Sequence, residues 1–472
     1  LARDRLGQKP LVYFCSGGGL AFASELKALR HAPGFPDAIN PQALHDYFTF
    51  HYVPSPQTIY AGVSKLPPAH YLEWEPGATT PSPKPYWELP DATDQALSFR
   101  DAAEQLRKLL SQAVKRRLMA DVPLGAFLSG GLDSACITSL MAQHMSRPVD
   151  TFTIGFAQPQ YDERTQAAEA AGMIGTIHHV READLQDFQV VQRVVENLGE
   201  PYADASVLPT GLLSAFARES VTVALSGDGA DELFGGYERY QAMQLANRLD
   251  IVPQLLRNGA LSGFARLLPA GRNERTFTSR LRRLCQVAAE SPDHRYLGLL
   301  SRIDEAAKRT LYGPAIDPAA IHETRFGGLS ATPPCDGAAA RLDLQTYLPG
   351  DILTKVDSAS MAVSLEVRSP FLDRDVVEFA CRLPWHFKQR HDLRKRVLLE
   401  ACRDLVPAAL QGRRKKGFGV PLCDWFRAGW KPLLQEILLD PRMADRGLVK
   451  PVTVEALIDD HATGRWDHSY TL

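Results

Sequence analysis

The chain has 472 residues, 45% of them hydrophobic and 23% charged, which is enough for about three domains with a large buried core. This composition excludes collagen-like, disordered and disulfide-scaffold proteins. The 53 Lys and Arg residues nearly balance the 55 Asp and Glu residues, so the chain lacks the excess of positive charge that holds nucleic acid. No apolar run approaches the roughly 18–20 residues of a membrane span, so a transmembrane protein is also excluded.

The cysteines predict a reducing, cytoplasmic environment. Their number is odd and no two stand in a C-x-x-C pair, which argues against a zinc knuckle or a disulfide framework; they are Cys15, Cys136, Cys285, Cys335, Cys381, Cys402 and Cys423. The pair His178-His179 lacks metal-ligand spacing to a second His or Cys cluster, and we interpret it as structural. The chain begins at Leu1 without a signal-peptide pattern, and we expect a fragment or a processed product.

The first 75 residues predict the end of a β-rich domain. Short apolar runs at residues 11–15 and 20–23 flank the glycines of residues 17–19, as in a hairpin. A phosphate-binding loop is the alternative for these glycines, but such a loop ends in Gly-Lys-Ser or Gly-Lys-Thr, which does not follow here.

Five prolines between residues 76 and 90 interrupt any regular element and predict a linker over residues 76–97. Beyond the linker, Ser98 followed by Asp101 is typical of a helix start, and apolar residues recur at helical spacing from Phe99 to Ala113.

From residue 124 onward, apolar strand-like runs alternate with helical patterns. We expect strands at residues 124–128, 149–156 and 221–225, and helices around Ile137 and over residues 162–173 and 184–197. Such alternation is typical of parallel βαβ units, so we predict an α/β fold with a doubly wound, mainly parallel sheet. After Gly236 the pattern becomes mostly helical, and a helical run through Val363 ends at Pro370.

A loop with two adjacent glycines follows the first of these strands. Adjacent glycines let the backbone approach an anion, and the N-terminus of the next helix supplies free N–H groups. A carboxylate beside a phosphate repels it unless a cation bridges the two, so Asp133 indicates Mg²⁺. The alternative is an Asp–Ser helix cap after a glycine turn. The candidate ligand-binding residues of this loop are Leu128, Ser129, Gly130, Gly131, Asp133 and Ser134.

A second such loop directly follows the strand at residues 221–225 and contains Ser226, Gly227, Asp228 and Asp231. In a parallel sheet, ligands bind at the carboxyl ends of the strands, near a switch in strand order. We therefore expect both loops to border one crevice, with Asp133 and Asp231 on opposite sides of a bound Mg²⁺–polyphosphate. An acidic surface turn is the alternative.

These residues resemble a known family. Residues 129–134 are similar to the pyrophosphate loop of ATP-pyrophosphatase-type enzymes, and together with residues 226–232 and 234–237 they resemble the glutamine-dependent asparagine synthetases. Further similar stretches are residues 2–11, 24–29, 351–357, 365–373 and 415–418. The resemblance implies the C-terminal part of an α+β N-terminal-nucleophile glutaminase domain over residues 1–75. It implies an adenine-nucleotide α-hydrolase-like synthetase domain over residues 98–472, whose C-terminal part is helical.

The resemblance implies an ATP-dependent carbon–nitrogen ligase that uses ATP and Mg²⁺. The β-carboxylate of aspartate attacks the α-phosphate of ATP, which releases pyrophosphate and forms β-aspartyl-AMP, and ammonia then displaces AMP. Leu128 and Ile154 would line the adenosine site, and Ser226 and Gly227 would contact the nucleotide. Lys395 falls where the family has a catalytic lysine, which can neutralise charge developing on the α-phosphate. A solvated basic helix face is the alternative for Lys395.

The acceptor acid stays open. Asp228 stands where asparagine synthetases usually carry a glutamate linked to forming the acyl-adenylate. A related amidotransferase or a lactam-forming ligase that adenylates another carboxylate is therefore the alternative function. Glu366 is a candidate catalytic partner carboxylate or half of a structural ion pair, and Glu200 and Asp204 are candidates to shape the acceptor pocket or to cap a loop.

The family's glutaminase half uses an N-terminal Cys whose own amine serves as base. No Cys lies near Leu1, and the chain stops at Leu472 where the family usually continues, so we expect truncation at both ends and no glutamine hydrolysis by this chain. The basic run at residues 413–416 fits a phosphate-side loop or a solvated turn better than a nucleic-acid site. We expect small-molecule substrates, no nucleic-acid or membrane partner, and a homodimer as one candidate assembly. A non-catalytic nucleotide-binding protein is a third hypothesis.

Overall fold

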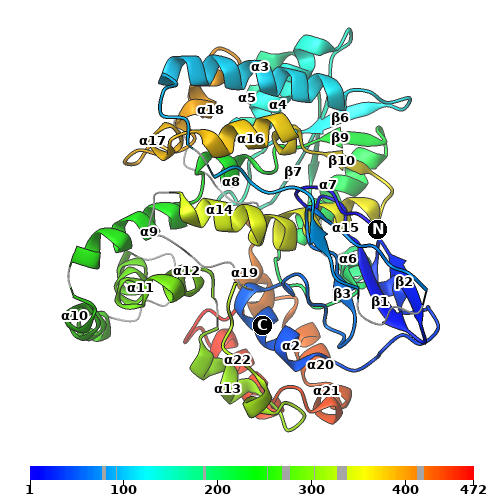
Figure 1. Ribbon diagram of the computed structural model, residues 1–472, viewed down its shortest axis with the longest axis vertical. Helices are drawn as coiled ribbons and strands as arrows, with labels where there is room; N and C mark the ends of the chain where they lie inside the picture. The colour runs from blue at the N-terminus through cyan, green and yellow to red at the C-terminus, as the bar shows by residue number, and fades with distance from the viewer. Residues whose placement is uncertain are drawn as a thin grey trace.

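The computed structural model describes residues 1–76, 81–91, 93–183, 188–251, 253–267, 277–301, 303–326, 337–411 and 419–472. In Figure 1 the chain starts in a small β-containing region, passes through a sheet covered by helices, and ends in helices beside the first region. Phe48 from the N-terminal region packs there against Leu311, Val454 and Ile458, so the two ends of the chain share a small apolar core.

The N-terminal region contains the predicted hairpin. Strands β1 (Val12–Ser16) and β2 (Gly19–Ala23) pair antiparallel, and β3 (Ser64–Lys65) pairs with the other edge of β1. Gly17 and Gly18 have φ of 57° and 75°, which a two-residue turn matched to the twist of a hairpin requires at both positions. The hairpin prediction is confirmed. Helices α1 (Leu26–Leu29) and α2 (Pro41–Phe50) follow.

The predicted linker is not free of regular structure. Strand β5 (Lys84–Pro85) pairs with β4 (His70–Tyr71), which lies before the linker. Further along, Trp87 Nε1 donates a hydrogen bond to Glu378 at 2.9 Å, and Leu89 is buried in the main core. The prolines therefore exclude long elements but leave a segment that binds both parts of the chain.

A five-stranded sheet forms the centre of the larger part of the molecule, with the order β10-β9-β6-β7-β8 and all neighbours parallel. The chain begins this sheet at its central strand, continues to one edge, and returns to fill the other side. The order therefore switches between β6 and β9. The strands are β6 (Leu124–Phe127), β7 (Asp150–Gly155), β8 (Ile177–Glu182), β9 (Val223–Leu225) and β10 (Glu366–Arg368).

Both faces of this sheet carry apolar side chains, because successive residues of a strand point to opposite faces. Val223 and Leu225 of β9 pack in one cluster with α3 (Phe99–Arg117) and α4 (Leu132–His144), whereas Ala224 packs in another with Leu213 of α7 (Val207–Arg218). Helices on both faces are what the predicted βαβ alternation requires. Helix α3 starts as expected, since Ser98 Oγ accepts a hydrogen bond from the N–H of Asp101.

Two strands differ from the sequence prediction. We did not expect β8, whose side chains are mostly exposed at the sheet edge and therefore form no apolar run. We expected the helical pattern before Pro370 to continue, but β10 occupies three residues there because they pair with β9. In β8, His178 Nδ1 lies 3.0 Å from Thr151 Oγ1 and His179 Nε2 lies 2.9 Å from Asp150 Oδ1, which fits their structural interpretation.

The remaining described elements are helical, as predicted for most of the chain after Gly236. None of the helices in the described part of the chain is both long and apolar enough to cross a bilayer. They are α5 (Arg164–Ile174), α6 (Phe188–Leu198), α8 (Ala230–Phe234), α9 (Glu238–Arg248), α10 (Gln254–Leu267), α11 (Phe277–Ala289), α12 (Pro292–Leu300), α13 (Glu305–Leu311), α14 (Ala338–Gln345), α15 (Leu353–Met361), α16 (Arg374–Arg382), α17 (Trp385–Lys388), α18 (Arg396–Ala401), α19 (Leu422–Arg427), α20 (Lys431–Leu438), α21 (Pro441–Arg446) and α22 (Pro451–Ala462).

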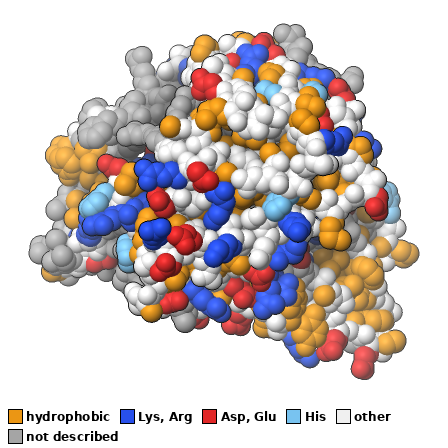
Figure 2. Space-filling model, turned by 90° about the horizontal axis from the view of Figure 1, so that it is seen from above, with side chains coloured by type: hydrophobic (Ala, Val, Ile, Leu, Met, Phe, Trp, Pro, Cys, Tyr) orange, Lys and Arg blue, Asp and Glu red, His pale blue; other side chains and the backbone are white. Residues whose placement is uncertain are grey.

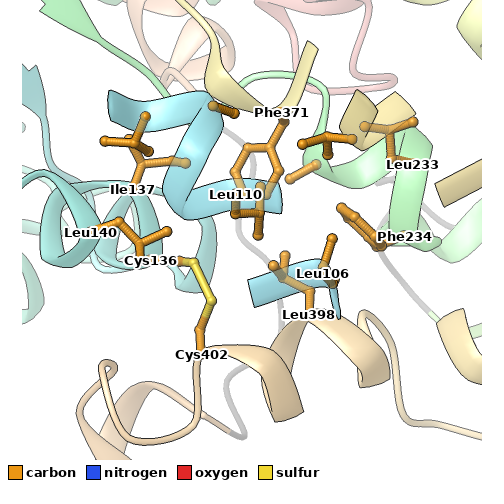
Figure 3. Packing of buried hydrophobic residues seen from close by; sticks show 14 of the residues in the cluster. Leu106, Leu110, Cys136, Ile137, Leu140, Leu233, Phe234, Phe371, Leu398 and Cys402 are labelled. Carbon is orange, nitrogen blue, oxygen red and sulfur yellow. A yellow bond between two sulfur atoms is a disulfide. The ribbon is translucent and has the colours of Figure 1, made fainter. Parts of the chain in front are cut away.

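One cysteine pair corrects the expectation from spacing. Cys136 of α4 and Cys402 at the end of α18 form a disulfide, with Cα atoms 6.0 Å apart and 266 positions between them in sequence. Figure 3 shows this bond among buried side chains that include Leu106, Leu140 and Leu398. Sequence spacing could not show it, because only the fold brings these two helices together.

The surface above α3 carries both signs of charge. In Figure 2 basic and acidic side chains are interspersed on this face. Several form ion pairs on α3 and α16, such as Arg116 with Asp373 at 2.5 Å and Arg374 with Glu378 at 2.8 Å. Charges of opposite sign therefore also neutralise each other locally on this face.

Candidate active site

A large cavity of about 2200 Å³ opens at the carboxyl ends of β6 and β9, where the strand order switches. Both predicted glycine-containing loops border it, as a doubly wound sheet leads one to expect. Glu366 and Glu200 do not line this cavity, whereas the other sequence-predicted nucleotide, metal and catalytic residues do: Leu128, Ser129, Gly130, Gly131, Asp133, Ser134, Ile154, Ser226, Gly227, Asp228, Asp231 and Lys395.

The first loop is held by hydroxyl contacts within it. Ser134 Oγ accepts a hydrogen bond from the N–H of Ser129 at 3.0 Å and lies 2.9 Å from Ser129 Oγ. A side chain at Gly130 would not fit, since an added Cβ would lie 2.4 Å from Cβ of Gln166. Helix α4 begins directly after Gly131, which has no side chain to cap it, so N–H groups of its first turn can bind an anion.

The second loop packs directly on the first. A Cβ added to Gly227 would lie 2.9 Å from Cβ of Asp133, so only a glycine allows this approach. Ser226 donates its N–H to the carbonyl of Arg368 at 2.9 Å and its hydroxyl to Asp228 Oδ2 at 2.7 Å. Gly229, with φ of 92°, turns the chain into the short helix α8 that carries Asp231.

Lys395 joins the two loops. Its Nζ lies 2.6 Å from Asp133 Oδ2 and 2.6 Å from Asp231 Oδ1, so the two carboxylate oxygens are at most twice that distance apart. Lys395 immediately precedes α18 and has φ of 51°, a left-handed conformation that residues other than glycine rarely adopt. We call Lys395, Asp133 and Asp231 the first lysine cluster.

One carboxylate oxygen of Asp133 has no hydrogen-bond donor among the described residues. This oxygen, Oδ1, is buried. An unsatisfied buried acceptor costs about 1–3 kcal/mol, so this oxygen is suited to bind a cation. Mg²⁺ is commonly held by one or two carboxylates together with substrate phosphates. The residues present therefore fit a Mg²⁺ ion held by Asp133 and Asp231.

A second lysine lines the same cavity. Lys355 Nζ lies 2.6 Å from Asp204 Oδ2 and donates to Ser206 Oγ at 2.8 Å. Burial opposes charge on both ionised groups, but their ion pair raises the pKa of Lys355 and, with the hydrogen bonds from Ser206, lowers that of Asp204. We call Lys355, Asp204 and Ser206 the second lysine cluster.

Two buried acids stand beside these clusters. Burial raises the pKa of Glu232, the neighbour of Asp231, to about 7, although Tyr237 OH donates a hydrogen bond to its Oε1 at 2.6 Å. Burial and the charge of Asp204 raise the pKa of Asp351 to about 6. Each of these carboxyl groups therefore stays protonated to a higher pH than an exposed acid.

Glu366 lies apart from the other predicted residues. Arg368 donates to both of its carboxylate oxygens, at 2.7 and 3.1 Å, and the guanidinium of Arg368 continues to the carbonyl of Arg117. The structural ion pair that we had left open for Glu366 is thus the arrangement observed. Glu200 also faces away from the cavity, since it forms an ion pair with Lys65 and accepts the N–H of Ile59 at 3.2 Å.

The sequence did not single out Lys355, Ser206 or Glu232 as site residues. Lys355 and Glu232 lie in stretches that carry the family resemblance, but only the contact with Asp204 distinguishes Lys355, and only burial and the contact with Tyr237 distinguish Glu232. Both open interpretations of Asp204 are observed, since it lines the cavity and also caps its loop by accepting the N–H of Ser206 at 2.9 Å. The similar stretch at residues 415–418 and the basic run at residues 413–416 both lie outside the described residues.

Comparison with known proteins agrees with these observations. The sequence model of the asparagine synthase family matches residues 105–472, and that of the glutamine amidotransferase domain matches residues 1–87. A putative asparagine synthetase (glutamine-hydrolyzing) of Mycobacterium bovis is 34% identical over all of this chain and 72% of its own length. Asparagine synthetase (glutamine-hydrolyzing) 1 of Bacillus subtilis is 30% identical over 99% of this chain and 72% of its own length.

A more distant relative has a different name. Amidase chyE of Penicillium rubens is 27% identical over 90% of this chain and 68% of its own length. The match to the family model over most of the chain, together with the two synthetases, decides the assignment: the chain belongs to the asparagine synthase family.

Proposed function

We propose that this chain is an ATP-dependent ligase that adenylates the β-carboxylate of aspartate and transfers ammonia to the product. Carboxylate and ATP give β-aspartyl-AMP and pyrophosphate; ammonia then forms the amide bond, releases AMP, and loses a proton. The observation that carries the proposal is the position of Lys395 Nζ, 2.6 Å from both Asp133 and Asp231 where two glycine-containing loops meet.

The loops supply the groups that such a reaction needs at the phosphates. The N–H groups at the start of α4 bind phosphate oxygens, and Asp133 and Asp231 hold Mg²⁺, which neutralises phosphate charge when bound. Of the three N–H donors of its ammonium, Lys395 uses one in a hydrogen bond to Asp133 and directs a second to the ion pair with Asp231. The third can contact the α-phosphate, where fixed positive charge stabilises the transition state. Leu128 and Ile154 offer buried apolar walls for the adenine ring.

The proposal extends to the domains. The boundaries that we propose are residues 1–75 for the C-terminal part of a glutaminase domain, 76–97 for the linker and 98–472 for the synthetase domain, with the sheet of an adenine-nucleotide α-hydrolase. The match of residues 1–87 to the glutamine amidotransferase domain supports glutamine as the source of ammonia in a protein that carries the whole glutaminase.

A second candidate function keeps the adenylation and changes the acid. Asp228 favours it, because the side chain is one methylene shorter than the glutamate usual in asparagine synthetases. In the structure Asp228 Oδ2 is held by Ser226 Oγ at 2.7 Å, on the same loop that we assign to the nucleotide. The Penicillium relative carries the name of an amidase and not of a synthetase, which also supports this second candidate.

The test is to supply the chain with ATP, Mg²⁺, ammonia and one candidate acid at a time. We expect aspartate to give AMP, pyrophosphate and asparagine in equal amounts. If AMP and pyrophosphate form with another acid but not with aspartate, the second candidate function is favoured. Formation of ADP and phosphate instead would overturn both, and binding of ATP without pyrophosphate release with every acid would favour a non-catalytic protein.

A further inference from the structure

The second lysine cluster contributes the ammonium group of Lys355 to the lining of the cavity. Lys355 belongs to α15, is 8% exposed, and lines the cavity together with Asp204 and Ser206. Its ammonium has three N–H donors. Among the described residues, Asp204 Oδ2 and Ser206 Oγ accept two of them, and one donor is left over.

The ammonium of Lys355 stays charged because acidic groups surround it. Asp204 lies in direct contact, and Asp351 and Asp228 are close enough to raise the pKa of Lys355 further. Asp351 is itself held by Tyr202, whose hydroxyl donates to Oδ1 at 2.5 Å. A buried ammonium with an unused donor gains most from a ligand that brings a negative charge, because hydrogen bonds between charged groups are the strong ones.

The position of Lys355 relates it to the proposed site of adenylation. The charge of Asp228 helps to raise the pKa of Lys355, and Asp228 Oδ2 accepts the hydroxyl of Ser226 at 2.7 Å. Gly227, between Ser226 and Asp228, packs on Asp133 of the first lysine cluster. One end of an acid bound in this cavity can therefore reach the phosphate-binding loops while its other end reaches Lys355.

We propose that Lys355 binds a second carboxylate of the acceptor acid, the one that is not adenylated, and so selects dicarboxylic acids. This inference rests on the proposed adenylation and narrows its substrate class. Ser206 and Asp204 orient the ammonium, and its remaining N–H donates to the acceptor. An acid with a neutral group in place of the second carboxylate leaves that donor unpaired in a buried position, which favours the dicarboxylate.

The first test changes the substrate and needs no variant. Aspartate and its α-amide carry the same β-carboxylate, but the α-amide lacks the second negative charge. We expect the kcat/KM for AMP formation to be about 10–100-fold higher with aspartate, as for loss of a charge-assisted hydrogen bond. Equal values for the two acids would overturn the inference while leaving adenylation in place. If neither these nor any other acid gives AMP, the proposed function itself fails.

The second test removes the ammonium. In Lys355→Met we expect the KM for aspartate to rise about 10–100-fold with a smaller change in kcat, and the preference over the α-amide to disappear. The KM for ATP should stay within about twofold, because Lys355 is assigned to the acid and not to the nucleotide.

A matched control is available outside the cavity. Lys308 is also a buried lysine bound to a carboxylate and a hydroxyl, Glu305 Oε1 and Thr49 Oγ1, both at 2.5 Å, and it does not line the cavity. Its Nζ also lies 3.3 Å from His45 Nε2 and 3.5 Å from Thr324 Oγ1. Lys308→Met should therefore leave the discrimination between aspartate and its α-amide unchanged. An unaltered preference in a folded Lys355→Met protein, or the same loss in both variants, would overturn the assignment. If Lys355→Met does not fold, the comparison of the two acids with the unmodified chain decides alone.

Discussion

The two lysine clusters of the cavity use the same residue types in different ways. Lys395 precedes a helix, has a left-handed backbone conformation, and lies between aspartates from two separate loops. Lys355 lies inside α15 with ordinary helical geometry and binds one aspartate and one hydroxyl. The first cluster also contains a buried carboxylate oxygen on Asp133 that accepts no hydrogen bond from the described residues.

This difference supports the proposed division into a site of chemistry and a site of acid recognition. A strained backbone and an unsatisfied acceptor persist only where surrounding structure holds them, and such features gather at active sites. The first cluster is thus arranged for a ligand that supplies both cation and phosphate. The second is nearly satisfied by the protein and lacks one acceptor, so it distinguishes between ligands with little change in structure.

The largest expected effect tests the first cluster. Lys395→Met removes the only cation in contact with both Asp133 and Asp231 among the described residues. We expect the kcat for pyrophosphate release to fall about a thousandfold, as for other fixed charges at a phosphoryl transition state. The KM for aspartate should change little, because the second cluster remains. Steady-state pyrophosphate release with varied aspartate measures both quantities.

The same variant can break the comparison. If Lys395→Met instead raises the KM for aspartate and leaves kcat within about tenfold, the two lysines have exchanged roles and the first cluster is the one that selects the acid. Thermal denaturation of the variant shows whether the fold is retained, so that unfolding is not mistaken for a loss of catalytic activity.

The two clusters were not equally predictable from the sequence. Residues 129–134 and 226–232 need glycines where their backbones approach an anion and each other. These glycines can be recognised in the sequence itself. Lys355 and Asp204 are common residues in a helix and a loop, and they meet only after α15 packs beside α7. Glu366 shows the reverse case, since its place in a similar stretch suggested a catalytic partner, whereas the strand pairing of β10 directs it to Arg368.

The elements of the fold were likewise predictable where a local sequence pattern determines them. Apolar runs predicted β6, β7 and β9 because those strands are buried, and helical spacing predicted α3 to α6 within a few residues, whereas α7 was not predicted. The strands β8 and β10 lie at the sheet edges, where fewer side chains need to be apolar. Their positions depend on pairing with a neighbouring strand, and no local pattern carries that information.

The next largest expected effect concerns the buried acids beside the clusters, which change how the stability of the fold depends on pH. The pKa of Glu232 rises from 4.5 to about 7, mainly through burial. Between these pH values the folded protein retains a proton that the unfolded chain has released, so the free energy of unfolding falls as the pH rises. The loss amounts to at most about 3 kcal/mol by pH 7. Glu232→Gln should remove this part of the pH dependence in urea unfolding from about pH 5 to about pH 8.

Asp351, the buried acid beside the second lysine cluster, provides a second measurement of the same kind. Burial and Asp204 raise the pKa of Asp351 from 3.8 to about 6, so Asp351→Asn should remove a decrease that is complete near pH 6. The two variants are expected to flatten the profile in different pH windows. Identical profiles for both variants and the unmodified chain would show that neither buried carboxyl group changes its proton occupancy on folding.

The smallest effect concerns the contact between the loops. Gly227→Ala places a Cβ 2.9 Å from Cβ of Asp133 and 3.1 Å from the backbone nitrogen of Ser134, so the two loops must separate by a few tenths of an ångström. We expect ATP to bind about tenfold more weakly, because its phosphates contact both loops, while the preference for aspartate over its α-amide is kept. Gly172→Ala in α5 is the matched control, since an added Cβ there meets no atom within 4 Å and alanine favours the helix. Unchanged ATP binding in Gly227→Ala would mean that the nucleotide binds only one of the two loops. The first lysine cluster would then not connect two phosphate-binding elements.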